Sequence, residues 1–280
     1  MARRTAKPEK AYKSEEFLAS ADARPLRILS EFIEPFHRFR RQQIKDTIVF
    51  FGSAKVKPRK DALRDLHTIQ HKVRRSKRVS PALQDKLRDA ETDVLMSCYY
   101  EDAVELARRL TEWSKKLYQM QRFVICSGGG PGIMEAANKG AFLAGGKSIG
   151  LNISLAFEQF ANSYITKELN FEFHYFFMRK FWFVYLAKAL VMFPGGFGTL
   201  DELMEVLTLI QTKKTKKKMT VLLYGRDYWE RIINFQALLD YRVVSAADLK
   251  IFAFADNPDD AFKYLTRELK RNYPVNGPSL

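Results

Sequence analysis

One stretch of the chain, residues 189–202, combines residue types that could bind a phosphate ester and act on it. An apolar run reaches Pro194, glycines follow, and Thr199 opens a segment with helical apolar spacing. This pattern predicts a strand, a turn and a helix, and such a turn lets backbone N–H groups approach a phosphate at the positive end of the helix. Glu202 lies three residues after Thr199. The pair therefore fits either a helix capping box or a carboxylate held beside a phosphate. The glycines are Gly195, Gly196 and Gly198.

Two other predicted strands also run into small-residue turns. Residues 46–51 lead into Gly52-Ser53-Ala54, and residues 123–126 lead into 127–132, which contains Gly129 and Gly130. Ligands of open parallel sheets bind beyond the carboxyl ends of the strands. We therefore expect the three turns to converge on one crevice.

A single arginine, Arg179, lies in an aromatic-rich segment just before the strand that leads to Pro194. A semi-buried guanidinium needs an anionic partner. A nearby carboxylate in an ion pair would serve, and so would the phosphate or ribose oxygens of a ligand.

The glycine turns do not match the standard nucleotide signatures. Where the dinucleotide fingerprint requires a third glycine, position 133 is Ile and position 201 is Asp. The tripeptide 146–148, Gly-Lys-Ser, resembles the end of a P-loop, but it precedes a strand and position 141 is Ala. NAD binding and nucleoside triphosphate hydrolysis are disfavoured, whereas a mononucleotide phosphate remains compatible.

Hydrophobic periodicity predicts strands alternating with helices, which is typical of an α/β, Rossmann-like, doubly wound and mostly parallel sheet with helices on both faces. Further strands are expected at 147–153, 165–173, 190–193, 219–224 and 251–254, and helices at 26–43, 93–118, 133–144, 176–186, 228–239 and 258–269. The first of these helices has an apolar face formed by Leu26, Leu29, Ile33, Phe36 and Phe39.

Charge and composition indicate one domain with appendages. We expect a basic N-terminal extension with a helix over 1–45, a single nucleotide-binding domain over 46–270 with a basic insertion at about 55–91, and a tail over 271–280. Residues 1–91 hold 23 Lys/Arg and 12 Asp/Glu within a chain of net charge +15. Such an appendage is either a solvated face or a surface for an anionic partner such as nucleic acid, and no aromatic-interleaved recognition motif favours the latter.

Several classes of protein are disfavoured. No apolar run reaches about 20 residues, so no membrane span is expected, and the first residues lack the apolar core of a secretory signal. The two cysteines fit a reducing cytoplasm. His67 and His71 would share a helix face, but they lack a third ligand and are expected to be surface residues. No metal or cofactor is expected.

The motifs together resemble the LONELY GUY family of phosphoribohydrolases. Residues 194–202 match its P-G-G-x-G-T-x-x-E signature, and Met178-Arg179-Lys180 matches its M-R-K element. The turn 127–134 resembles its first glycine turn, and 51–53 its opening G-S-S, although position 54 is Ala. The resemblance spans about residues 46–240. Proteins of this family are often labelled lysine decarboxylases, but no lysine here lies in a recognisable pyridoxal-phosphate context.

The resemblance implies hydrolysis of the N-glycosidic bond of a purine nucleoside 5′-monophosphate to free base and ribose 5-phosphate. Glu202 and Arg179 would be the catalytic residues, and the nucleotide would be held by the three glycine turns, Ser53, Thr199, Met178 and Lys180. The family also implies a homodimer or higher homo-oligomer. The extension and the insertion are absent from the short cytokinin-activating enzymes, which favours AMP or a related nucleotide over a cytokinin riboside monophosphate. A nucleotide sensor without turnover and a nucleic-acid-binding protein are the alternatives.

Overall fold

A seven-stranded sheet forms the centre of the molecule, in a computed structural model that describes residues 7–117, 121–155 and 160–274. The strand order is β4-β3-β2-β1-β5-β6-β7, and every pair is parallel, which confirms the predicted α/β, Rossmann-like fold. From β1 the chain builds outward to β4 and then returns to the other side of β1 with β5. The strands are β1 (Thr47–Phe51), β2 (Val124–Ser127), β3 (Ser148–Ile153), β4 (Asn170–Phe173), β5 (Ala187–Met192), β6 (Thr220–Tyr224) and β7 (Phe252–Ala255).

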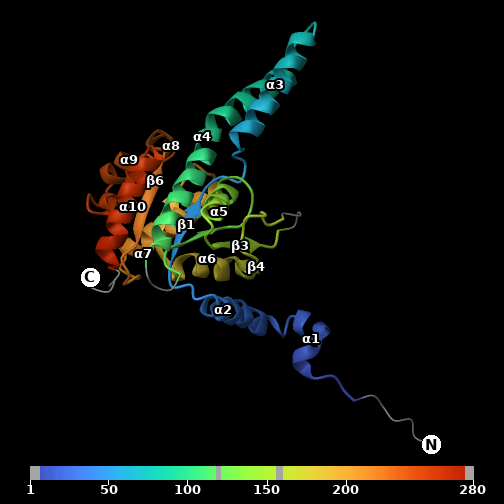
Figure 1. The fold of residues 1–280 in the computed structure, drawn as a ribbon, viewed down its shortest axis with the longest axis vertical. Helices are drawn as coiled ribbons and strands as arrows, with labels where there is room; N and C mark the ends of the chain where they lie inside the picture. Colours follow the sequence, from blue (N-terminus) through green and yellow to red (C-terminus); the bar gives the residue numbers. More distant parts are fainter. Residues whose placement is uncertain (1–6, 118–120, 156–159, 275–280) are drawn as a thin grey trace, which may run out of the picture.

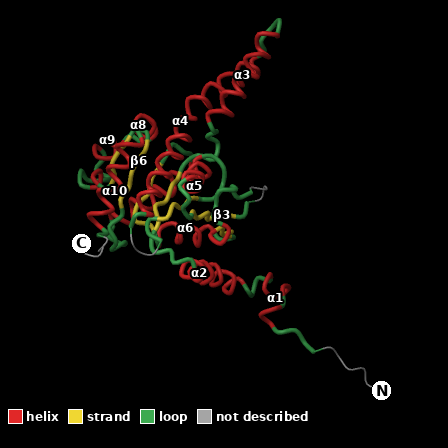
Figure 2. Tube along the Cα trace, viewed as in Figure 1, coloured by secondary structure: helices red, strands yellow, loops and turns green. Residues whose placement is uncertain are grey.

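Helices cover both faces of the sheet, and each face has its own hydrophobic core (Figures 1 and 2). One core contains side chains of α4 (Pro81–Lys115), α5 (Ile133–Leu143) and α10 (Pro258–Asn272). The other contains side chains of α2 (Arg24–Arg41), α6 (Phe176–Tyr185), α7 (Phe197–Gln211) and α8 (Arg226–Ile232). The interior strands β1 and β6 are buried at every residue, as expected of strands covered on both faces. The edge strand β4 alternates between exposed and buried residues.

Several element boundaries differ from those expected. The predicted helix at 228–239 is divided into α8 and α9 (Phe235–Asp240), because the backbone is extended at Ile233. The strand predicted at 165–173 is only β4, and a short 3-10 helix at 167–169 precedes it. The closing helix α10 continues to Asn272 and so enters the expected tail. Near the N-terminus, α1 (Glu15–Ala19) precedes α2.

The basic insertion is a helical hairpin that projects from the body (Figure 1). It consists of α3 (Arg59–Arg75) and the first part of α4, which runs without a break from Pro81 into the body. We call residues 59–90 the arm. Its buried residues are Ala62 and Ala90, so the two helices pack mainly on each other. The expected start of a separate helix at residue 93 was wrong, since no residue between 82 and 115 breaks the helix.

The apolar face expected of α2 is buried only in part. Phe39 lies in the core, whereas Leu26, Leu29, Ile33 and Phe36 are between 41% and 53% exposed. Pro35 lies inside α2 and is itself buried. Periodicity therefore identified the face of the helix correctly but not the extent of its burial.

Candidate active site

The three small-residue turns line one cavity of about 430 Å³, which confirms the predicted convergence. The cavity lies beyond the carboxyl ends of β1, β2 and β5, at the point where the strand order reverses. Helix α6 and Met134 of α5 supply other parts of the wall. The lining residues are Phe51, Gly52, Ser53, Ala54, Lys55, Gly128, Met134, Phe176, Arg179, Phe183, Gly196, Phe197, Gly198, Thr199, Asp201 and Glu202.

Backbone contacts of Ser53 fix the turns to one another. Its N–H donates to the carbonyl of Pro194 over 2.9 Å, and its carbonyl accepts from the N–H of Ile133 over 3.1 Å. Gly132 has a φ of +70°, and a Cβ there would lie 2.3 Å from the Ser53 carbonyl oxygen. The Ser53 hydroxyl accepts from the N–H of Lys55, so this side chain also stabilises its own turn.

The turn after β5 places its glycines in two different environments. Helix α7 begins at Phe197, with Gly196 as its N-cap residue. A Cβ on Gly195 would lie 2.2 Å from Thr199 Oγ1, whereas a Cβ on Gly196 or Gly198 would meet open space. Gly195 is therefore required by packing, and its carbonyl accepts from the Tyr228 hydroxyl over 2.7 Å. The other two leave room for a ligand to approach the start of the helix.

Glu202 is a buried carboxyl with no partner of its own. Its side chain is 8% exposed, and Oε2 has no hydrogen-bond partner in the described part of the chain. Since Thr199 lies inside α7 and not at its cap, the capping-box interpretation was wrong. Burial raises the pKa of Glu202 to about 7, although the charges of Lys180 and Arg179 favour the ionised form.

Arg179 is held by carbonyl oxygens and not by an ion pair. Its Nε donates to the carbonyl of Leu151 over 2.7 Å, and Nη2 donates to the carbonyl of Gly128 over 3.4 Å. The guanidinium carbon lies 5.0 Å from the centre of the Phe183 ring. Burial lowers the pKa of Arg179, and the charge of Glu202 opposes that shift. Within residues 7–117, 121–155 and 160–274 no carboxylate pairs with this guanidinium.

Of the two neighbours of Arg179 in the M-R-K element, Met178 packs in the core and Lys180 forms ion pairs. Met178 is 7% exposed and lies in the core on the α6 side of the sheet. Lys180 Nζ lies 2.7 Å from Asp201 Oδ2 and 2.8 Å from Glu205 Oε2. Burial would lower the pKa of Lys180, but these two hydrogen bonds raise it above its usual value. Neither side chain lines the cavity, although both had been expected to bind the nucleotide.

The glycine turn after β2 meets the cavity at a residue other than the two expected. Gly128 lines the cavity, and a Cβ there would lie 2.5 Å from Arg179 Nη2. Gly129 and Gly130 instead present carbonyls to the Asn162 side-chain amide, over 3.0 and 3.1 Å. These two glycines shape the turn and do not line the wall.

Two aromatic residues of the cavity were missed. Phe197 is 93% exposed and Phe176 is 56% exposed, although both are large apolar side chains. Phe197 occupies the variable position of the glycine signature, so an aromatic residue next to a phosphate-binding turn was an available signal. A second, larger cavity of about 760 Å³ lies against the base of the arm, but it contains neither Glu202 nor Arg179.

No three metal-ligating side chains come together among the residues that the structure describes, and His67 and His71 are exposed on α3, as expected. Across the same residues, no helix has the length and apolarity needed to cross a membrane.

A match to a family model agrees with the motifs. Residues 134–265, which include Arg179 and the 194–202 signature, match the family model described as "Possible lysine decarboxylase", and this match confirms the predicted family resemblance. No curated protein matches the chain. The X-ray structure of TM1055, a structural genomics target, is similar at 21% identity, covering 79% of this chain and 99% of that one with a TM-score of 0.47. The Moco carrier protein from Chlamydomonas reinhardtii is similar at 17% identity, covering 81% and 99% with a TM-score of 0.47.

Proposed function

We propose that this chain hydrolyses the N-glycosidic bond of a purine nucleoside 5′-monophosphate, because its motifs resemble those of the LONELY GUY family and residues 134–265 match the family model described as "Possible lysine decarboxylase". AMP is the preferred candidate substrate. The observation that supports this most is the position of Glu202, a buried and unpartnered carboxyl in the same cavity as Arg179 and the start of α7. A carboxyl placed in this way costs stability in the free protein, which is expected of a group kept for chemistry.

The 5′-phosphate would bind at the N-terminus of α7. The first N–H groups of a helix have no intrahelical acceptor, so those at 197–199 are available to phosphate oxygens. The open space at Gly196 and Gly198 allows close approach. Arg179 would neutralise the phosphate or orient the ribose, and a charged hydrogen bond of this kind contributes roughly 1.5–3 kcal/mol.

The reaction would proceed through a ribose that gains positive charge as the bond to the base breaks, as in other glycoside hydrolyses. The electron pair of that bond leaves with the base. The oxygen of a water molecule forms the new bond to the anomeric carbon, while ionised Glu202 stabilises the charged ribose and accepts a proton from that water. The departing base takes up one proton from solvent, and Glu202 then returns its proton to solvent, so the reaction consumes one water and no net proton. A pKa of about 7 suits this exchange, because a general base works best when its pKa lies near the working pH.

The purine would lie near the apolar rim of the cavity. Phe176 and Phe197 present exposed rings there, and an aromatic face can stack on a base. A nucleoside lacking the phosphate would lose the contacts at α7, so the proposal requires monophosphates to be better substrates than nucleosides.

The test is an assay for free base on a panel of nucleosides, monophosphates and triphosphates. Release of adenine from AMP is expected, with Glu202→Ala inactive but still able to bind AMP. Glu205→Gln, which changes a carboxylate one turn along α7 and outside the cavity wall, is the matched control and should keep most of the activity. Equal rates on nucleosides and monophosphates would contradict the proposed phosphate site at the N-terminus of α7. If the wild type binds AMP but releases no adenine, the result would instead support the alternative of a nucleotide sensor.

We further propose that the active form is a homodimer, as the family resemblance implies. The partly exposed apolar side chains of α2 offer a surface, because Phe32 and Phe36 lie beside Phe181 and Tyr185 of α6 with ring centres 5.4 and 6.4 Å apart. Ile33→Glu on this face should convert a dimer to a monomer in sedimentation or light scattering, whereas Leu95→Glu, on an exposed apolar residue of α4, should not.

A further inference from the structure

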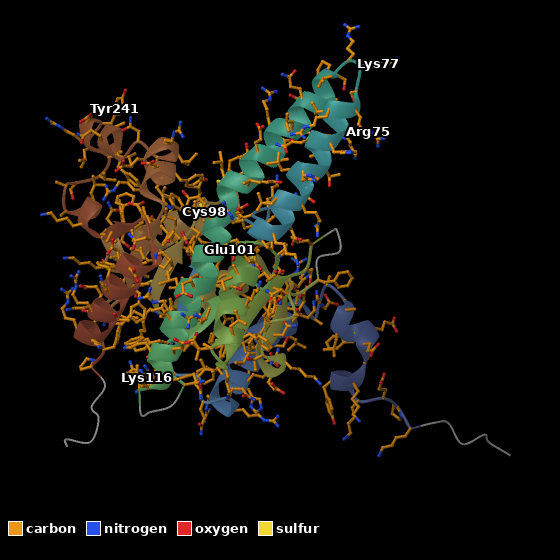
Figure 3. All side chains as sticks on the ribbon, turned by 45° about the horizontal axis from the view of Figure 1, so that its top comes forward. Arg75, Lys77, Cys98, Glu101, Lys116 and Tyr241 are labelled. Atoms are coloured by element: carbon orange, nitrogen blue, oxygen red, sulfur yellow. The ribbon has the colours of Figure 1, made fainter. Side chains whose placement is uncertain are left out.

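The arm carries a concentrated positive charge at its outer end. From residue 66 to residue 84 there is no Asp or Glu, and five Lys or Arg lie within 72–78. These five are Lys72, Arg74, Arg75, Lys77 and Arg78. Arg75 and Lys77 lie at the end of the arm that is farthest from the sheet (Figure 3).

Pairing of charges differs between the base and the tip of the arm. Near the base, Lys57 contacts Asp65 and Asp93, each over 2.9 Å, and Arg64 contacts Asp61 over 2.8 Å. At the tip, no carboxylate among the described residues lies within ion-pair distance of the five cations. Like charges so close together repel one another, so a polyanion bound at the tip would relieve the repulsion.

The composition of the arm favours one class of polyanion. No Phe, Tyr or Trp occurs between residues 52 and 98, although single-stranded nucleic acids are held largely by base stacking on aromatic side chains. Two helices side by side span about 20 Å, which exceeds the roughly 12 Å width of the DNA major groove. The arm therefore suits contact with the phosphates that border a groove, and not with base edges inside it.

From these observations we propose that the tip of the arm, residues 72–78, binds the phosphate backbone of double-stranded nucleic acid without sequence specificity. The inference is independent of the hydrolysis proposed for the cavity. The arm projects outward from the body, so a duplex at its tip would not need to cover the sheet or its helices (Figure 1).

Fluorescence anisotropy with a labelled duplex of about 20 base pairs and arbitrary sequence tests the proposal. If all five cations contact phosphates, the slope of log K against log salt is about −4.5, which corresponds to about 500-fold weaker binding at 200 mM than at 50 mM salt. Neutralising the five cations to Gln should abolish most of the affinity and flatten the slope. Two duplexes of unrelated sequence should bind equally.

A matched control neutralises another exposed basic cluster, Lys213, Lys214, Lys216 and Lys218, in the loop after α7. This variant should retain the affinity and the slope of the wild type, and circular dichroism verifies that both variants are folded. The proposal fails if the tip variant binds the duplex like the wild type, or if the two variants weaken binding equally. Tighter binding to single strands or to vesicles of anionic lipid than to the duplex would also overturn it.

Discussion

The cavity and the arm both contain charged side chains, but these differ in burial and in what surrounds them. In the cavity, Glu202 is buried and its Oε2 has no hydrogen-bond partner among the described residues, and Arg179 is held by two backbone carbonyls. At the tip of the arm, Arg74, Arg75 and Lys77 are exposed on a helix and a turn that bury almost nothing. A charge in a dry, fixed site can change the course of a reaction, whereas a charge in water mainly attracts a counterion.

Charge density alone therefore does not indicate where a reaction takes place. The tip of the arm has a dense run of positive charge, yet the side chains suited to chemistry lie in the cavity, where positive and negative groups occur together. Substitutions in the cavity should therefore change rate and stability, and substitutions in the arm should change neither.

The largest expected effect is that of Glu202→Gln on hydrolysis. The amide keeps the shape of the side chain but can neither stabilise a cationic ribose nor accept a proton, so we expect kcat to fall by about 10²–10⁴-fold. The affinity for AMP, measured by calorimetry, should change little. Neutralising the five cations at the tip of the arm should leave kcat within twofold of the wild type, and a loss comparable to that of Glu202→Gln would show that the arm contributes to the reaction.

The same substitution should stabilise the protein at neutral and higher pH. The pKa of Glu202 is raised from its ordinary value near 4.5 to about 7. The contribution of Glu202 to the free energy of unfolding is therefore most favourable below pH 4.5 and is lost as the pH rises through about 7. At pH 8, Glu202→Gln should be about 2–3 kcal/mol more stable than the wild type to denaturant, with the difference shrinking toward pH 4.5. A constant difference across this range would mean that the carboxyl is not desolvated.

The rate of the wild type should rise with pH through about 7.

Arg179→Lys should have a smaller effect on catalysis. A lysine cannot donate to both Leu151 and Gly128 carbonyls in the planar geometry of a guanidinium while it also faces a ligand. We expect kcat/KM for AMP to fall by roughly 10–100-fold, which corresponds to the loss of one charged hydrogen bond. A steady-state comparison of AMP with adenosine measures this, and the loss should be smaller for adenosine if the guanidinium contacts the phosphate.

The sequence predicted the fold and the main features of the site because both depend on local patterns. Buried strands are short apolar runs, and the turns of the cavity are marked by glycine and serine beside those runs. Glu202 and Arg179 each lie within a specific signature, and the structure places both in the predicted cavity. Local patterns of this kind do not depend on how distant parts of the chain meet.

What the sequence did not predict depends on tertiary contacts. Lys180 was expected at the nucleotide, but Asp201 and Glu205 of α7 hold its ammonium group. Gly128 lines the cavity, whereas the carbonyls of the two glycines after it accept from the side-chain amide of Asn162. Which of the three glycines faces the cavity depends on the conformation of the turn and on this contact with a loop distant in the sequence. The spacing of apolar residues in α2 likewise shows which face is apolar but not whether another surface covers it.

The smallest effect, and the most discriminating, is expected at the glycines before and inside α7. Gly198→Ala places a methyl group in open space, so the protein should keep its stability. The same methyl group would crowd a phosphate bound at the helix N-terminus and should raise KM for AMP by about 5-fold, equivalent to roughly 1 kcal/mol. Gly195→Ala instead forces a Cβ to within 2.2 Å of Thr199 Oγ1 and should cost about 1–3 kcal/mol of folding stability. Thermal unfolding and initial rates on both variants separate the two outcomes. An unchanged KM in Gly198→Ala would show that the ligand binds away from this turn, whereas a loss of stability would show that Gly198 is required by packing and not by the ligand.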